Sequence, residues 1–232
     1  NRKKLLARFL LCVLLITLAG TVFAKSTYGD YIFQNKNTYG IPEINTNAEV
    51  DSNGTMTIRQ KWVFDDKYTD GTEHYIVFNN GSLKGAKLKD FQVYQNGQAL
   101  EEVSWDVGGS FEEKAGKFGF NETMFDTELC FGIGEKRSDN TFEITYKVEN
   151  AIEKTKDGAY FLHWKFINDN LSDPVGKIRL ELTFPNKVLK IYGFGYEGLV
   201  AMADDKANTV VYENGPDRPL REDNQLIALV EV

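Results

Sequence analysis

Residues 44–64 read INTNAEVDSNGTMTIRQKWVF, and this stretch decides the fold class. Apolar residues alternate with polar ones from Ile44 to Val50, which is the period of a β-strand. After the turn DSNG, the alternation resumes and places Met56 and Trp62 on one face, with charged residues between them on the other. Glycine in the turn permits a positive φ. The stretch therefore predicts an antiparallel hairpin with one apolar and one polar face.

The same pattern extends toward the C-terminus. Asn96-Gly97 lies between two alternating runs in residues 87–105, which is the signature of a two-residue hairpin turn. Further strand-like runs occur at residues 74–80, 127–134, 141–152, 159–167, 177–185, 187–196, 208–214 and 224–232. About ten to twelve strands at this spacing are typical of a β-sandwich. The sequence does not show the βαβ alternation that would indicate a parallel sheet. We therefore predict one all-β domain, an antiparallel β-sandwich, over residues 44–232.

The first 24 residues have a different character. A basic start, NRKKLLAR, precedes the apolar run FLLCVLLITLAGTVF, and Val22 and Ala24 supply residues suited to a cleavage site. This is the pattern of a secretory signal-peptide helix at residues 1–24, cleaved after Ala24. The alternative is an uncleaved anchor, but the run is short against the roughly 20 residues that a spanning helix needs. Residues 25–43 show no clear period and are interpreted as a lead-in segment.

Net charge and cysteine content indicate which partners and which cellular compartment suit this chain. The chain has a net charge of −7, and the basic leader carries no acidic residue, so the rest is more acidic still. Such a surface repels phosphate backbones, which makes nucleic acid an unexpected partner. Cys12 lies in the leader, which leaves Cys130 without an internal disulfide partner, as suits a bacterial envelope protein. We expect Cys130 to be buried as a small hydrophobe.

Residues 157–174 contain His163 beside Trp164. On a strand, Leu162, Trp164 and Phe166 share one face, and His163 lies on the other. We therefore interpret Trp164 as part of the core and His163 as a half-buried sheet residue. A catalytic histidine would need a nucleophile, and no motif such as G-x-S-x-G occurs.

Other candidate chemistry is weak in this sequence. Two acidic loops could offer calcium ligands, at Asp65, Asp66, Asp70 and Glu73, and at Asn168, Asp169, Asn170 and Asp173, but neither has the order of a calcium-binding loop. The carboxylate pairs Glu101-Glu102 and Glu112-Glu113 point to opposite faces of a strand. Trp105 is the best candidate for an exposed sugar-stacking ring, since Trp62 and Trp164 fall on core faces. We expect no catalytic residue, no cofactor and no metal site.

Several stretches together carry a family resemblance. In order, NAEVDSNGTMTIRQKWVF, GTEHYIVFNN, KLKDFQVYQNGQ, SFEEKAGKFGFNET, ELCFGIG, TFEITYKVENAI and DGAYFLHWKFI resemble segments of the YciQ-like predicted bacterial membrane proteins, in their Gram-positive form. The exported part of that family is domain of unknown function 2207. The resemblance covers residues 44 to 232, although Gln60 stands where the first hairpin usually carries a glutamate. It implies a signal peptide and an exported β-domain, followed by transmembrane helices and a glycine-rich tail, with no established activity.

Two functions remain open. The first is a non-enzymatic binding or sensing module on the extracytoplasmic side of the bacterial membrane, anchored through downstream segments, with a cell-envelope protein or glycan as possible ligand. The second is a carbohydrate-active hydrolase that uses two carboxylates. A deep cleft with two carboxyl groups about 5–10 Å apart would favour the hydrolase.

Overall fold

The first hairpin forms as its alternation predicts. In the computed structural model, β1 (Ile41–Val50) pairs antiparallel with β2 (Met56–Asp65), and Ile44 lies opposite Trp62. The carboxylate of Asp51 accepts two backbone N–H hydrogen bonds across the turn. The hairpin buries one face of both strands, as expected from the sequence.

The structure describes residues 39–232 except 135–137, 170, 195, 197–198, 205–207, 216 and 222. The expected signal-peptide helix at 1–24, and residues 25–38 of the expected lead-in, lie outside this part of the chain. Strand β1 begins at Ile41, three residues before the expected Ile44. The reason is that Ile41 is 1% exposed and pairs with Val175, so the chain is already in the sheet there.

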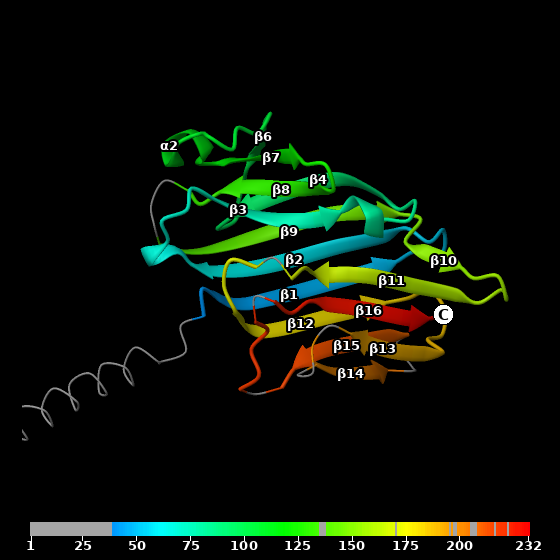
Figure 1. Cartoon of the computed structure of the whole chain (residues 1–232). Helices are drawn as coiled ribbons and strands as arrows, with labels where there is room; N and C mark the ends of the chain where they lie inside the picture. The colour runs from blue at the N-terminus through cyan, green and yellow to red at the C-terminus, as the bar shows by residue number, and fades with distance from the viewer. Residues whose placement is uncertain are drawn as a thin grey trace, which may run out of the picture. The chain divides into compact units, whose positions relative to one another are not determined.

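The largest sheet has eight strands in the order β14-β15-β12-β1-β2-β9-β4-β5 (Figure 1). Besides the first hairpin it contains β4 (Lys87–Gln95), β5 (Gln98–Ala99), β9 (Asp139–Glu149), β12 (Val175–Thr183), β14 (Leu199–Asp204) and β15 (Thr209–Asn214). The hairpin strands β1 and β2 therefore lie at the centre of the sheet, as their long apolar faces require.

Two four-stranded sheets complete the domain. One has the order β10-β11-β16-β13, formed by β10 (Ile152–Lys154), β11 (Tyr160–Ile167), β16 (Leu226–Glu231) and β13 (Lys190–Phe194). The other has the order β3-β8-β7-β6, formed by β3 (Glu73–Asn79), β8 (Asp126–Gly132), β7 (Lys117–Glu122) and β6 (Glu101–Glu102). Short helical turns connect strands at η1 (Asp66–Tyr68), η2 (Asn80–Ser82) and α2 (Phe111–Lys114).

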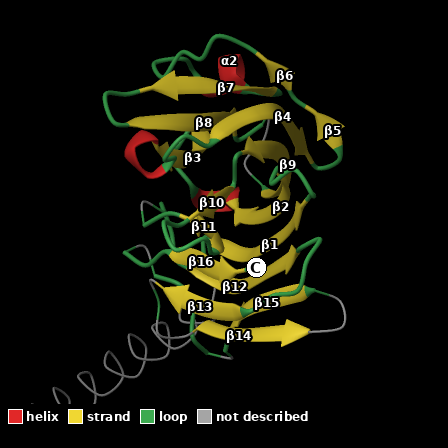
Figure 2. Cartoon of the chain, turned by 90° about the vertical axis from the view of Figure 1, so that its right-hand side faces the viewer, coloured by secondary structure: helices red, strands yellow, loops and turns green. Residues whose placement is uncertain are grey.

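Both small sheets cover the same face of the large sheet (Figure 2). Ile58 of β2 and Phe142 of β9 are fully buried on that face. Phe142 packs on Phe131 of β8 with ring centroids 4.6 Å apart, and Trp164 of β11 belongs to the same core. Burial of this shared apolar face is the main term that stabilises the sandwich.

Gln60 forms a polar link between the two layers. It lies on the inward face of β2 and is only 2% exposed. Its Nε2 donates to the backbone carbonyl of Phe166 on β11 at 3.1 Å, and its Oε1 accepts the indole N–H of Trp62 at 3.3 Å. An ionised glutamate could not donate to that carbonyl, so the amide is the residue that satisfies both partners here.

The prediction of an all-β, antiparallel β-sandwich is confirmed. The described residues contain sixteen strands, and short ones such as β5, β6 and β10 account for much of the difference from ten to twelve. Two pairs are parallel, β1 with β12 and β6 with β7. The strands of the first pair are distant in sequence, which local periodicity does not report, whereas β6 and β7 are consecutive strands joined through α2. Trp62 and Trp164 are buried in the core, as expected.

None of the helices within the described part of the chain is long and apolar enough to cross a membrane.

We expect Trp164 and His163 to differ sharply in their contribution to stability. Trp164 is 6% exposed, so Trp164→Ala should lower the free energy of unfolding by about 3–5 kcal/mol through the cavity that it leaves. The His163 side chain is exposed, so His163→Ala should cost about 1 kcal/mol or less. Denaturant unfolding of both variants measures the difference. A His163→Ala variant as unstable as Trp164→Ala would contradict this assignment.

Candidate functional site

A groove lies where the two small sheets meet, and we name it the seam groove. It encloses about 330 Å³ between β3 and η2 on one side and β11 and β16 on the other. Its lining is formed by Val77, Phe78, Asn79, Gly81, Ser82, Leu83, Lys84, His163, Trp164, Lys165, Asn168, Gln225 and Ile227. A smaller depression continues along the same two strands and shares Val77 and Lys165 with it.

On the first bank, the free edge of β3 faces the groove. Strand β3 is the last strand of its sheet and pairs with β8 alone among the described strands. Just beyond the end of β3, the N–H of Asn80 donates to the carbonyl of Phe125 at 2.9 Å. This bond shows that the backbone groups of even-numbered residues in β3 point toward β8. In an antiparallel pair, backbone groups point alternately toward and away from the partner strand. Those of Tyr75, Val77 and Asn79 therefore point away from β8.

The second bank is the exposed half of β11. The N–H of Val232 donates to the carbonyl of Tyr160 at 3.0 Å, so even-numbered residues of β11 bond toward β16. On the opposite edge, β10 pairs with β11 only as far as Leu162. The register of that ladder places His163 opposite Ala151, so the backbone groups of Lys165 are the ones left on an edge that no described strand covers. Figure 1 shows that β3 and β11 run in opposite directions.

The floor of the groove is apolar and its banks are cationic. Phe78 and Trp164 are each 6% exposed and close the bottom. Lys84 stands on the β3 side and Lys165 on the β11 side. Their nearest carboxylate oxygens lie 3.7 and 3.9 Å away, at the outer limit of an ion pair, so both ammonium groups can take another partner. No aspartate or glutamate lines the groove among the described residues.

Two amide side chains lie in the groove. The Nδ2 of Asn168 donates to the outward carbonyl of Val77, which is where a neighbouring strand would place a peptide N–H. The Oε1 of Gln225 is buried and has no hydrogen-bond partner among the described residues. A buried acceptor without a donor is costly, so this oxygen favours a ligand that brings an N–H group.

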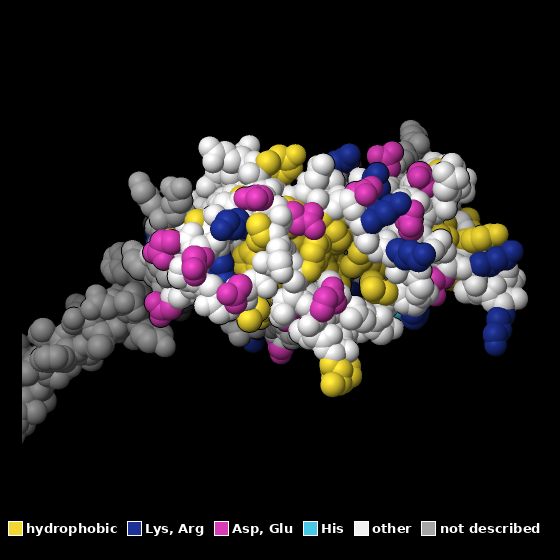
Figure 3. Space-filling view, turned by 90° about the horizontal axis from the view of Figure 1, so that it is seen from above, with side chains coloured by type: hydrophobic (Ala, Val, Ile, Leu, Met, Phe, Trp, Pro, Cys, Tyr) yellow, Lys and Arg dark blue, Asp and Glu magenta, His cyan; other side chains and the backbone are white. Residues whose placement is uncertain are grey.

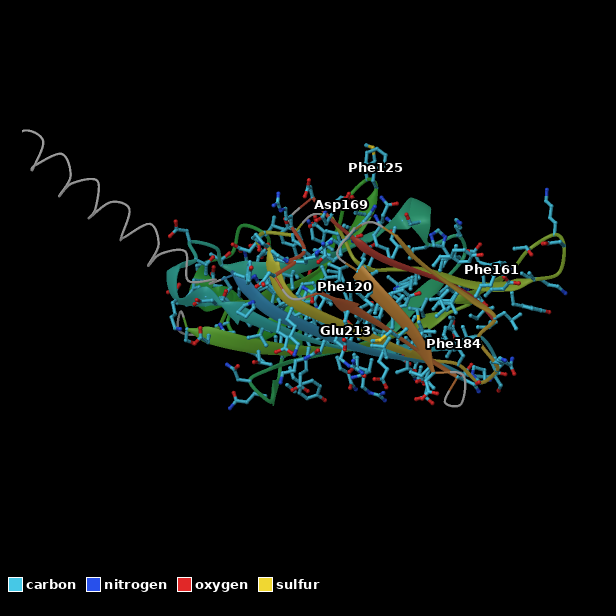
Figure 4. All side chains as sticks on the ribbon, turned by 90° about the horizontal axis from the view of Figure 1, so that it is seen from below. Phe120, Phe125, Phe161, Asp169, Phe184 and Glu213 are labelled. Carbon is cyan, nitrogen blue, oxygen red and sulfur yellow. The ribbon has the colours of Figure 1, made fainter. Side chains whose placement is uncertain are left out.

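The rim near η2 carries an exposed hydrophobic tip. Met124 and Phe125, in the turn between β7 and β8, are 86% and 67% exposed. The carbonyl of Phe125 is bonded to Asn80 of η2, so the tip is held beside the groove. Figure 4 shows Phe125 projecting on the same side of the domain as Asp169, which follows β11.

A buried polar network lies near the start of β3, at the end away from η2. His74 Nε2 is 2.8 Å from Asp66 Oδ1, and the other oxygen of Asp66 accepts from Asn140 Nδ2 at 2.8 Å. His74 stacks on Phe64 with centroids 3.7 Å apart. These hydrogen bonds join η1, β3 and β9 at this end of the sandwich. The sequence analysis considered Asp66 only as a candidate calcium ligand in an acidic loop and gave His74 no role.

Trp105 is not the free sugar-stacking ring that its sequence position suggested. Its indole N–H donates to Glu73 Oε2 at 2.8 Å, and Lys114 Nζ lies 5.7 Å from the ring centroid. Lys114 is 4% exposed and forms an ion pair with Glu73 at 2.8 Å. The three side chains fasten α2 and the loop before it to β3.

The candidate calcium loops do not converge on a metal site. Asp66 and Glu73 are engaged as described above, and no group of three or more His, Cys, Asp or Glu side chains in the described residues is placed to hold a metal ion. Asn168 lies in the seam groove, whereas Asn170 falls outside the described residues. Asp169 lies near Lys165, which gives it a structural partner instead.

Three carboxylates border a hollow between β4 and β7. Asp90, Glu102 and Glu122 line this second groove, together with Phe91 and Phe120, around about 490 Å³. Figure 3 shows hydrophobic side chains between acidic and basic ones on this face. A hydrogen bond from Lys147 lowers the pKa of Asp90, the opposite of what a general acid requires. The pair Glu112-Glu113 lies elsewhere, on α2, where Glu113 forms a capping box with Ser110.

Family comparison agrees with the resemblance noted in the sequence. The family model described as "Predicted membrane protein (DUF2207) N-terminal domain" matches residues 40–222. The chain belongs to this family. The match covers β3, η2 and β11 of the seam groove, whereas Gln225, Ile227 and the rest of β16 lie beyond its last residue. No curated protein is significantly similar in sequence.

Solved structures share the fold at low sequence identity. Yeast LTA4 hydrolase in complex with bestatin superposes with a TM-score of 0.52 and 11% identity, covering 85% of this chain and 29% of that one. Native yeast LTA4 hydrolase gives 0.52 and 12%, with 84% and 29% covered. This chain thus spans less than a third of those proteins. At such identity the likeness concerns the β-architecture of the DUF2207 domain alone.

Cys130 is buried, as the sequence analysis expected, at 1% exposed. Burial raises the pKa of its thiol to about 12, and the carboxylates of Glu73 and Glu128 act in the same direction. Only the thiolate reacts with alkylating reagents. At pH 8, Cys130 should therefore react at least about a hundredfold more slowly in the native chain than in the unfolded chain, whose thiol pKa is near 8.5. Labelling in a Cys12→Ser background measures this, and equal rates would contradict burial.

Proposed function

We propose that the DUF2207 domain of this chain is a non-enzymatic binding module that takes its ligand in the seam groove, on the extracytoplasmic side of the membrane. The observation that supports it most strongly is the composition of the groove. An apolar floor, two available lysines and an unpartnered amide oxygen lie together, in a chain that is otherwise strongly acidic. Pockets of this kind, mostly apolar with a few convergent polar groups, are typical of binding sites.

The same composition argues against the rival function at this position. A glycosidase needs two carboxyl groups flanking the bond that is cut, one of them protonated. The described lining of the seam groove offers none. The groove between β4 and β7 offers three, but Asp90 is committed to Lys147, and Glu122 accepts a hydrogen bond from Thr127 at 2.7 Å.

The charge on the two banks indicates the ligand's character. Lys84 and Lys165 are 51% and 27% exposed at the side chain, and they stand on opposite sides of the apolar floor. A ligand that carries a negative group beside an apolar one would satisfy both features. The two lysines would attract a negatively charged ligand to the groove, while the acidic surface around them would repel it elsewhere.

Charge reversal in the groove tests the proposal. We expect Lys165→Glu to reduce retention of the exported chain on isolated cell envelopes at least tenfold, because it turns an attractive bank into a repulsive one. The matched control is Lys61→Glu, an exposed lysine on the outer face of β2. Equal loss in both variants would contradict a specific groove. Turnover of a chromogenic glycoside panel that Glu102→Gln or Glu122→Gln abolishes would instead support the hydrolase.

A further inference from the structure

We infer that the ligand of the seam groove is an extended peptide segment, which enters as a β-strand between β3 and β11. This inference rests on the proposed function and specifies its ligand class. The partner is a polypeptide with an acidic side chain close to an apolar one.

The backbone edges carry the first step of the argument. Tyr75, Val77 and Asn79 present outward backbone groups from β3, and Lys165 does so from the part of β11 beyond β10. Both edges border one groove. A row of backbone donors and acceptors with no neighbouring strand is a template for another strand, and peptide recognition by strand addition uses such edges.

The two amides in the groove carry the second step. The side-chain amide of Asn168 already donates to the carbonyl of Val77, as the backbone N–H of an inserted strand would. The unpartnered Oε1 of Gln225 is a buried acceptor on the other wall. Both features match the N–H groups of a peptide, which recur along a strand. A glycan bound by ring stacking would need an exposed aromatic face. Phe78 and Trp164 are each only 6% exposed, so neither offers one.

The side chains set the sequence preference. Residues of an inserted strand point alternately into and out of the groove. An inward apolar side chain would lie over Phe78 and Trp164, and a carboxylate would reach Lys165 or Lys84. The exposed pair Met124 and Phe125 at the rim would cover the end of the peptide nearest η2. Since β3 and β11 run in opposite directions, the peptide pairs parallel with one and antiparallel with the other (Figure 1).

A displayed library of random nine-residue peptides, selected on the exported chain, tests the inference. We expect enriched peptides to combine a carboxylate with β-branched residues. Synthetic versions should bind at least tenfold more weakly to Lys165→Glu than to the wild type, and unchanged to Lys61→Glu. N-methylation of alternate backbone amides, which keeps every side chain, should weaken binding at least tenfold in either register, because each register removes the donors to one of the two edges.

Three outcomes would overturn the inference, and they separate it from the proposed function. Peptides that bind equally well after N-methylation in either register would show side-chain recognition without strand insertion. Failure to enrich any groove-dependent peptide, while envelope retention still depends on Lys165, would leave the groove as a site for another ligand. Self-association that Lys165→Glu abolishes would assign the groove to a second copy of the chain. Loss of groove dependence in both assays would remove the proposed function as well.

Discussion

The structure depends on one constraint, which is that the eight-stranded sheet must cover its single apolar face. The hairpin β1–β2 places Ile44, Ile58 and Trp62 on that face, where all are buried. Leaving this apolar face in water would cost far more free energy than any surface interaction in the domain could supply. Two separate four-stranded sheets supply the cover, one through Phe131 and the other through Trp164. The Gln60 amide then fixes the position of β11 over β2 by a buried hydrogen bond.

A cover made of two pieces leaves a boundary, and the candidate site follows from it. One small sheet ends in the edge strand β3 at this boundary, the other presents the part of β11 that β10 does not cover, and no described strand ladder joins the two. The seam groove is the space between them. Its floor is the core that the two sheets share, while its banks carry lysines and backbone groups. The architecture and the proposed binding site are therefore two consequences of the same packing arrangement in this member of the DUF2207 family.

Sequence reasoning reached the parts of this account that are local. Alternation predicted the hairpins, the all-β class and the buried positions of Trp62, Trp164 and Cys130, because the period of a strand can be read from neighbouring residues. The parallel pairing of β1 with β12 could not be found in this way, since the two strands are far apart in sequence. The seam groove was missed for the same reason. His163 was judged by its own strand alone, whereas its place in the lining of the groove depends on β3, which is far from it in sequence.

The most direct measurement is amide-resolved hydrogen exchange of the native chain without ligand. The account requires that outward N–H groups on the two banks, at Val77, Asn79 and Lys165, exchange much faster than the inward ones at Ile76, Phe78 and Trp164, which are bonded within their sheets. An alternation of at least tenfold along both strands is the predicted result. Uniform protection along β3 and β11 would show that the two edges are already paired, and that no free edge exists for a ligand to bind.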